Sequence, residues 1–253
     1  RAAEITASAH RRAMRFARPG VHEYEVEAEL VHEFVRSGAQ APAYTSIVAT
    51  GANACVLHYV SNRALLKPDE LLLIDAGCEL DGYASDITRT FPASGPFLGA
   101  QKALYELVLA AQADAIAAVA PGRSFSDPHE AAVRTLAQGL IDLSLLEGAL
   151  DGVIESGAYR RFYMHRTGHW LGLDVHDAGD YGAEGRWKPL EPGMVLTVEP
   201  GLYVRPGEDV PEAYWNIGIR IEDDVVVAPT GCEVLTAQAP KLVAEIEALM
   251  RGP

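Results

Sequence analysis

The sequence predicts a single α+β domain in which helices are mixed with antiparallel hairpins. Segments typical of strands are joined by short turns, whereas a parallel sheet would need helices that alternate regularly with single strands. No linker, low-complexity tract or short repeat divides the 253 residues. A coarse internal symmetry is also visible, because each half contains helices and a strand pair with acidic residues in an apolar setting. We therefore expect one domain over 1–253.

The first half is expected to begin with two helices and to continue in strands. The first helix ends at Pro19-Gly20 and the second ends before Gly38, which are typical helix stop signals. The expected helices and then the expected strand segments are 4–18, 23–37, 45–50, 55–60 and 70–90.

The second half is expected to repeat this order. Two apolar-periodic segments are separated by Pro121-Gly122, and runs rich in β-branched residues follow them. The expected helices are 100–119, 126–146 and a closing helix at 240–251, and the expected strands are 162–165, 194–204 and 218–229.

Two aspartates lie in the hairpin at 70–90. Asp81-Gly82 is a strong two-residue turn signal, and a turn there places Asp75 opposite Thr88. Asp86 then shares a face with Asp75, and the two are diagonal neighbours about 7–8 Å apart. For the hairpin alone, a solvated face with surface aspartates is an equal alternative, but the apolar run before Asp75 favours burial.

Two glutamates lie in similar positions in the second half. Glu199 ends the apolar strand "MVLTVEP", and Glu222 shares a face with Arg220 in "GIRIEDD". This arrangement is expected of a ligand carboxylate held in place by an arginine. The alternative is an ordinary surface ion pair.

These four carboxylates and one imidazole make a set of oxygen and nitrogen ligands. Carboxylates can bridge, so the set is sufficient for two divalent ions of the type Mn, Mg, Fe, Co or Zn. Such a site activates water and stabilises an oxyanion, which are the needs of a hydrolase. A thiolate site is not expected, because Cys55, Cys78 and Cys232 are scattered without a CxxC motif.

Composition and charge exclude several classes of function. With 49% apolar and 22% charged residues, the chain can bury a full core and is not expected to be disordered. The formal net charge of −14 argues against a nucleic-acid partner. No apolar run approaches the roughly 18 residues of a membrane span, and the first twenty residues lack a secretory-signal core. We therefore expect a cytoplasmic protein without a membrane partner, in a reducing compartment.

Several separated blocks together resemble the catalytic domain of the pita-bread metallopeptidases, and most closely the bacterial Xaa-Pro aminopeptidase (aminopeptidase P) branch. The blocks are "TGANACVLHY", "LLLIDAGCELDGYASDITRTFP", "HWLGLDVHD", "MVLTVEPGLYV" and "GIRIEDDVVV", and the likeness runs from about residue 4 to 250. The resemblance implies a fold of two pseudo-symmetric halves around an antiparallel sheet.

The resemblance also implies a chemistry and its residues. It implies removal of the amino-terminal residue from peptides with proline second, by a hydroxide that bridges two divalent ions. The ions are usually manganese, with zinc, cobalt or iron also compatible. The implied metal ligands are Asp75, Asp86, His169, Glu199 and Glu222. The implied substrate-site residues are His58, His165, His176 and Tyr203, with Arg220 behind Glu222. Glu199 would carry a proton to the leaving nitrogen, and His176 would contact the carbonyl oxygen.

The chain departs from the family pattern in two places. The family usually has a separate amino-terminal domain before the catalytic one, and we expect that domain to be absent from this chain. The expected partners are peptide substrates and further copies of the chain in a homo-oligomer, with a separate amino-terminal domain or chain as a further partner. Arg166 stands where relatives have glycine. We expect Arg166 to point outward or to form a salt bridge rather than to meet substrate.

Three alternatives remain open. A prolidase-type dipeptidase shares the fold and metal set and would be distinguished by strict preference for Xaa-Pro dipeptides. Methionine aminopeptidase fits the blocks "NACVLHY" and "HWLGLDVHD" less well. A non-catalytic peptide-binding module is disfavoured, because such relatives normally lose metal ligands and all five residues are present here.

Overall fold

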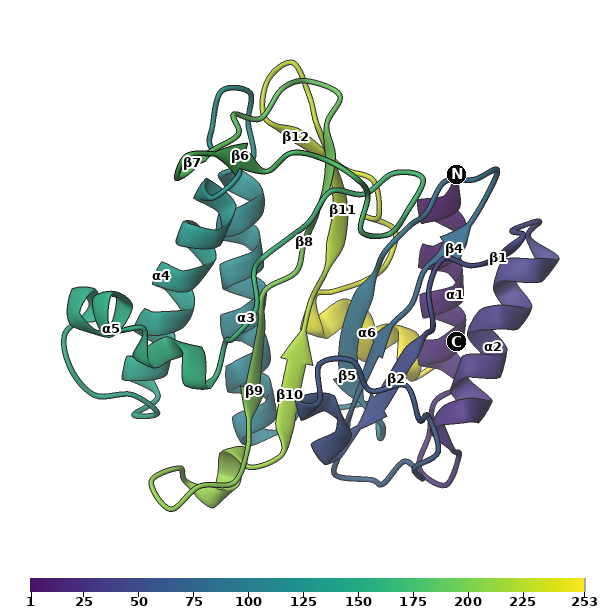
Figure 1. Ribbon diagram of the computed structural model, residues 1–253. Helices are drawn as coiled ribbons and strands as arrows, with labels where there is room; N and C mark the ends of the chain where they lie inside the picture. The colour runs from purple at the N-terminus through teal and green to yellow at the C-terminus, as the bar shows by residue number, and fades with distance from the viewer. Residues whose placement is uncertain (253) are drawn as a thin grey trace.

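The computed structural model describes residues 1–252 and consists of two similar halves, each with a pair of helices packed against antiparallel strands (Figure 1). In the first half, α1 (Ala2–Phe16) packs on α2 (Glu23–Arg36). In the second half, α3 (Gly99–Ala117) packs on α4 (Asp127–Asp142). The strands lie between the two helix pairs, so the predicted α+β architecture with two related halves is confirmed.

The sheet of the first half has the order β2-β3-β5, and all its pairs are antiparallel. Its strands are β2 (Ile47–Thr50), β3 (Leu71–Asp75) and β5 (Thr88–Pro92). The predicted hairpin register is confirmed, because Asp75 pairs with Thr88. Asp81 and Gly82 both have positive φ, 53° and 82°, as the tight hairpin turn requires.

The strands of the second half form one long hairpin that is interrupted at the site. They are β8 (Val195–Val198), β9 (Gly201–Val204), β10 (Ile217–Arg220) and β11 (Asp223–Val227). A further strand, β12 (Cys232–Val234), pairs with the other edge of β11. The ladder of β8 with β11 and the ladder of β9 with β10 have the same register. Glu199 and Glu222, which fall in the interruption, therefore lie opposite each other.

A backbone bridge between Thr88 and Glu222 joins the two halves. The Glu222 N–H donates to the Thr88 carbonyl oxygen over 3.1 Å. Asp75, Thr88, Glu222 and Glu199 thus form one row across adjacent strands, which lie about 4.8 Å apart. Directly opposite residues share a face of a sheet, so this row places three carboxyl side chains on the same face.

The remaining elements are short, apart from the closing helix. They are β1 (Ala41–Pro42), β4 (Cys78–Glu79), β6 (Gly182–Ala183), β7 (Arg186–Trp187), α5 (Leu150–Ser156), α6 (Val243–Met250) and the 3-10 turns η1 (Gly51–Cys55), η2 (Ala158–Arg161) and η3 (Glu212–Tyr214). Helix α5 was not predicted, because Gly152 interrupts a segment of only seven residues.

Two predicted strands are wrong. The segment 55–60 is a turn that follows η1, in which the Val56 N–H bonds to the Asn53 carbonyl oxygen over 2.9 Å. In 162–165, the Tyr163 N–H bonds back to the Tyr159 carbonyl oxygen over 3.0 Å and continues the turn of η2. In both places local i to i+3 or i+4 bonds satisfy backbone groups that a strand would pair across a ladder.

A single large apolar core lies between the helices and the sheet, and includes Leu30, Phe34, Leu72, Ile74 and Phe91. The cysteines Cys55, Cys78 and Cys232 are free thiols. Within residues 1–252, no helix has both the length and the apolar character needed to cross a membrane.

Candidate metal centre

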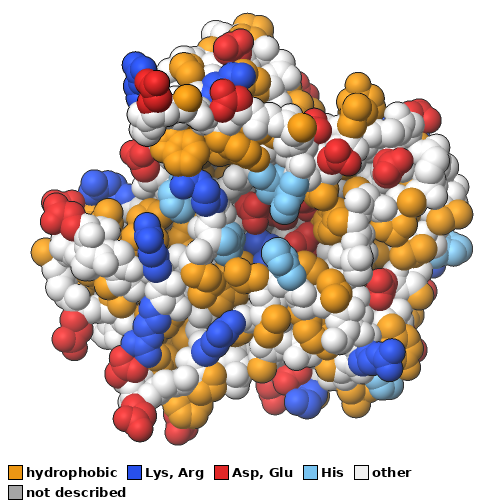
Figure 2. Space-filling model, in the orientation of Figure 1, with side chains coloured by type: hydrophobic (Ala, Val, Ile, Leu, Met, Phe, Trp, Pro, Cys, Tyr) orange, Lys and Arg blue, Asp and Glu red, His pale blue; other side chains and the backbone are white. Residues whose placement is uncertain are grey.

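A cavity of about 470 Å³ opens over the row of carboxylates and is lined by residues of both halves. Figure 2 shows acidic and histidine side chains at the floor of this hollow and a basic side chain at its rim. The lining includes almost every predicted site residue, namely His58, Asp75, Asp86, His165, His169, His176, Glu199, Arg220 and Glu222. Tyr203 is buried behind the wall, where it contacts His165 and Arg220.

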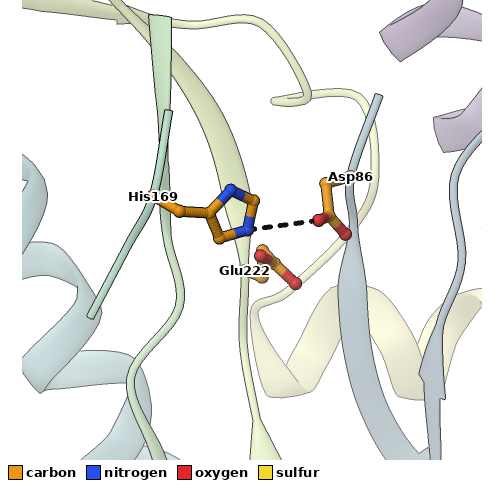
Figure 3. Close-up of side chains that lie close together, drawn as sticks. All are labelled: Asp86, His169 and Glu222. Atoms are coloured by element: carbon orange, nitrogen blue, oxygen red, sulfur yellow. Dashed lines mark ion pairs between the residues drawn. The ribbon is translucent and has the colours of Figure 1, made fainter. Parts of the chain in front are cut away.

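Asp86, His169 and Glu222 lie closest together. Each offers one ligand atom, and these atoms lie within 4.8 Å of one another. Figure 3 shows the three side chains converging from different segments, with the His169–Asp86 ion pair drawn. His169 Nε2 is 3.5 Å from Asp86 Oδ2 and 3.7 Å from Glu199 Oε1. His169 Nδ1 lies 3.0 Å from the Trp170 carbonyl oxygen, and donation there leaves Nε2 as the ligand atom.

The carboxyl groups are buried and repel one another. Burial raises the pKa of Asp86, and the charge of Asp75 raises it further. Burial and the charges of Asp86 and Glu199 raise the pKa of Glu222 well above its usual value. Burial raises the pKa of Glu199 to about 7, against the lowering effect of His169. A bound divalent cation would remove this repulsion, so the donor set fits a metal.

The pKa of His169 is raised as well, which for an imidazole favours the charged form. Burial lowers its pKa, but the hydrogen bond to Asp86 and the charges of Glu199 and Asp86 outweigh burial and raise the pKa to about 9. Without a metal, the imidazolium is therefore the cation that lies between Asp86 and Glu199.

The position of Tyr44 also shows that the carboxylate oxygens are crowded. Its hydroxyl lies 2.6 Å from Asp75 Oδ1 and is also in contact with Asp86 Oδ1. One hydroxyl proton can serve only one of these oxygens, so the other contact requires a protonated carboxyl or a cation nearby. The sequence analysis missed Tyr44, because a single aromatic residue in the irregular segment before β2 carries no pattern.

Arg220 differs from expectation, because its ion pair is with Asp75 and not with Glu222. Arg220 Nη2 donates to Asp75 Oδ2 over 2.6 Å, and Nη1 donates to the Tyr203 hydroxyl over 2.8 Å. Glu222 instead accepts a hydrogen bond of 2.6 Å from Thr88 Oγ1. The reason is the bridge between the halves, which inserts Thr88 beside Glu222 and brings Asp75 within reach of the long guanidinium.

The histidines of the wall are held differently from His169. His165 Nδ1 lies 2.7 Å from the Arg166 carbonyl oxygen, and Nε2 lies 2.8 Å from the Tyr203 hydroxyl. Burial, and then the charge of Arg220, lower the pKa of His165 to about 3, so this ring is neutral. His176 stands edge-on to His169 with ring centroids 4.2 Å apart.

Two aspartates that follow Glu222 were also missed, because "EDD" resembles a surface acidic run. Both are buried. Asp224 Oδ2 accepts the Asp86 N–H over 3.1 Å and so positions the backbone of that residue. Asp223 pairs with Arg89 Nη2 over 2.7 Å on the opposite side of the sheet. The two-residue strand period after Glu222 could have indicated that Asp224 shares its face.

Among residues 1–252, Arg166 forms no salt bridge, and its side chain is exposed. Its guanidinium lies 4.1 Å above the ring of Trp187, and the residue lines the rim of the cavity.

Comparisons with known proteins agree with this geometry. The family model "Metallopeptidase family M24" matches residues 1–229. Xaa-Pro aminopeptidase of Haemophilus influenzae is 52% identical over 249 residues, which cover 98% of this chain and 58% of that protein. Xaa-Pro aminopeptidase of Escherichia coli K12 is also 52% identical, over 99% of this chain and 56% of that protein.

Solved structures give the same result. A Pseudomonas aeruginosa aminopeptidase superposes with a TM-score of 0.97 at 59% identity, over 99% of this chain and 57% of that one. An Escherichia coli aminopeptidase P with the inhibitor Pro-Leu superposes with a TM-score of 0.96. The chain thus spans a little over half the length of the relatives it matches. With its two related halves and its converging carboxylates, the chain has the pita-bread fold and belongs to metallopeptidase family M24.

Proposed function

We propose that this chain is the catalytic part of a metal-dependent exopeptidase that removes the amino-terminal residue from peptides with proline in second position. One observation carries the proposal most strongly. Ligand-type side chains from both halves converge on a single cavity, although they lie far apart in the sequence. The names of the relatives, which are Xaa-Pro aminopeptidases, support the choice of substrate.

We propose that Asp75, Asp86, His169, Glu199 and Glu222 hold two divalent ions. The supporting observations are the oxygen and nitrogen donor set, the raised carboxyl pKa values and the close contact of Tyr44 with two carboxylates. When bound, such ions polarise a carbonyl group and lower the pKa of water. Manganese is our choice of ion, with zinc, cobalt or iron as the other metals to test.

Glu199 is the residue that we propose moves the proton to the leaving proline nitrogen. Its carboxyl lies between the proposed metal ligands and the substrate-binding histidines. Oε1 is 3.7 Å from the ligand atom His169 Nε2, and Oε2 is 3.8 Å from His165 Nδ1. A carboxyl between the ligand cluster and the wall can take a proton from one side and return it on the other.

The remaining site residues bind and orient the peptide in this proposal. His176 stands beside His169 and is assigned to the carbonyl oxygen that gains negative charge. His58 lines the cavity, and His165 presents a neutral ring that the Tyr203 hydroxyl holds in place. Arg220 orients Asp75 and Tyr203 rather than touching substrate.

We also propose that residues 1–253 act as one catalytic domain in a homo-oligomer in the cytoplasm. The free thiols of all three cysteines are compatible with the reducing conditions of that compartment.

A metal-dependent assay tests the proposal. The chain is stripped with a chelator, and cleavage of Xaa-Pro, Xaa-Pro-Xaa and Xaa-Ala-Xaa peptides is measured before and after addition of Mn²⁺, Zn²⁺, Co²⁺ or Fe²⁺, with metal content determined on the same samples. We expect activity on Xaa-Pro-Xaa only in loaded samples. Full activity in the stripped sample would refute the metal mechanism, and strict preference for Xaa-Pro dipeptides would replace the aminopeptidase by a prolidase.

A further inference from the structure

Arg166 is an exposed cation at the rim of a cavity whose floor is acidic. It lines the cavity together with His165 and Glu199. Among residues 1–252, Arg166 is in no ion pair, although its neighbours in sequence and space form several. A guanidinium that no carboxylate of the protein neutralises is available to an anionic group that enters the cavity.

The guanidinium is held in a defined place by an aromatic platform. It stacks on Trp187 at 4.1 Å from the ring centroid. Trp187 packs in turn against Phe125, which contacts Trp170 and Tyr181 with centroid distances of 4.6 and 4.9 Å. Stacking occupies the face of the guanidinium and leaves the N–H groups at its edge free to donate.

The backbone of Arg166 is fixed to the site as well. Its carbonyl oxygen lies 2.7 Å from His165 Nδ1, and the next residue, Thr167, accepts the Glu199 N–H over 2.8 Å. His129, which contacts Thr167 Oγ1 at 2.8 Å, is neutral at pH 7, because burial and the charge of Arg166 lower its pKa to about 4. Arg166 is therefore a positioned cation beside the proposed proton carrier.

We propose that Arg166 binds a carboxylate of the peptide substrate and so makes the enzyme prefer anionic peptides. This inference rests on the proposed function. If the first residue of a peptide occupies the ligand cluster, the rest of the peptide extends toward the rim. The carboxylate is then the carboxyl terminus of a short peptide or an acidic side chain, and either can pair with both N–H groups of one guanidinium edge.

Substrate pairs that differ only in one negative charge test the inference. The value of kcat/KM is measured for Xaa-Pro-Ala against its carboxyl-terminal amide, and for Xaa-Pro-Asp-amide against Xaa-Pro-Asn-amide. For the unaltered chain we expect a preference of about three- to tenfold for the anionic member of at least one pair, carried mainly by KM. The pair that shows it identifies the source of the carboxylate. Added salt should reduce the preference.

Variants at the rim assign this preference to one residue. Arg166→Gln should bring the ratio close to one, and Arg166→Lys, which keeps the charge but loses the planar fork, should give an intermediate ratio. Arg186→Gln is the matched control, because Arg186 is an exposed arginine next to Trp187 in the β6–β7 hairpin and lies outside the cavity lining. It should keep the full ratio.

The inference and the proposed function fail in different ways. Equal rates for both members of each pair, or a preference that survives Arg166→Gln, would overturn the role of Arg166 while leaving the peptidase intact. If no peptide is cleaved at all, the proposed function fails. In that case the inference is tested by binding alone. The affinities of the metal-loaded chain for the dipeptide Pro-Leu and for Pro-Leu-amide are measured by calorimetric titration. Binding that does not distinguish the two, or that Arg166→Gln leaves unchanged, would overturn it.

Discussion

Arg220 reaches across strand β5 to form an ion pair with Asp75 of strand β3, with 2.6 Å between Nη2 and Oδ2. Both side chains are largely buried, 5% and 14% exposed, so solvent screens this pair little. The same guanidinium contacts Tyr203 and Thr88. One side chain of the second half therefore holds a carboxylate of the first half in place.

Loss of this guanidinium should damage both stability and function. Arg220→Gln leaves the buried Asp75 carboxylate without its cation, and we expect a loss of about 3–5 kcal/mol in the free energy of unfolding of the metal-free chain. Removal of such a supporting partner should also lower metal affinity or kcat/KM by about 10- to 100-fold. Denaturant unfolding, metal titration and peptide kinetics measure these effects. Arg36→Gln, an exposed arginine of α2, is the control. Metal affinity and kinetics equal to those of the unaltered chain would contradict this account of Arg220.

The metal-free chain should lose stability as the pH rises. The pKa of Glu199 is raised from 4.5 to about 7, so its contribution is fully present below pH 4.5 and is lost as the pH rises through 7. The pKa of His169 is raised from 6.5 to about 9, so its contribution is present below pH 6.5 and is lost as the pH rises through 9. Both effects have the same sign. The buried neutral rings of His165 and His129 have the opposite effect, but only up to pH 6.5. Unfolding midpoints of the stripped chain should therefore decrease from pH 6.5 to pH 9.

Bound metal should reverse this dependence, because the ions require the deprotonated ligands. Midpoints at pH 5, 7 and 9 with and without Mn²⁺ are the measurement, and Glu199→Gln should flatten the metal-free curve. A stripped chain that is equally stable at pH 7 and pH 9 would contradict the raised pKa values of Glu199 and His169.

Asp223 should be one of the most sensitive positions for stability. It is fully buried and pairs with Arg89 and Lys241, each over 2.7 Å. Burial raises its pKa, but the charges of Arg89 and Lys241 outweigh burial and lower it to about 2. Its contribution is therefore present above pH 3.8 and is lost as the pH falls through 2. Asp223→Asn should cost about 3–5 kcal/mol at neutral pH, because it leaves the buried guanidinium of Arg89 without its carboxylate.

The same change should disturb the site, because Arg89 Nη1 also donates to the carbonyl oxygens of Thr88 and Glu222 over 2.9 and 2.6 Å. Urea unfolding at pH 7 and metal titration measure the two effects. Glu233→Gln, at an exposed position of β12, is the control. A loss below about 1 kcal/mol would show that the network is not needed for folding.

Glu23 should control the loop that carries His58. Its buried carboxylate accepts the N–H groups of Thr50 and Ala64, each over 2.8 Å, and the Tyr59 hydroxyl over 2.8 Å. In Glu23→Gln the side-chain NH₂ would face these donors, at an expected cost of about 1–3 kcal/mol. Because His58 lies inside the loop, KM for Xaa-Pro-Xaa should rise more than kcat falls. Glu4→Gln, at an exposed position of α1, is the control. An unchanged KM in Glu23→Gln would show that Glu23 does not influence substrate binding.

Features that depend on neighbours in the sequence could be predicted well. The Asp81-Gly82 turn defined the hairpin, and the two-residue period of a strand then placed Thr88 opposite Asp75. Apolar periodicity and helix stop signals located five of the helices to within a few residues. The strands predicted at 55–60 and 162–165 were wrong, because apolar residues in short segments do not reveal whether a ladder partner exists.

The sequence by itself determined the kinds of side chain available and the pairing within each hairpin, because a tight turn and a fixed strand period need only local information. Only the tertiary structure decided which groups meet across the two halves. Thr88 and Glu222 are 134 residues apart in the chain, and Tyr44 contacts carboxylates that lie 31 and 42 residues away. The partner of Arg220 and the platform under Arg166 depend on such contacts. The packing of the two halves against each other determines these contacts, and no local sequence pattern predicts that packing.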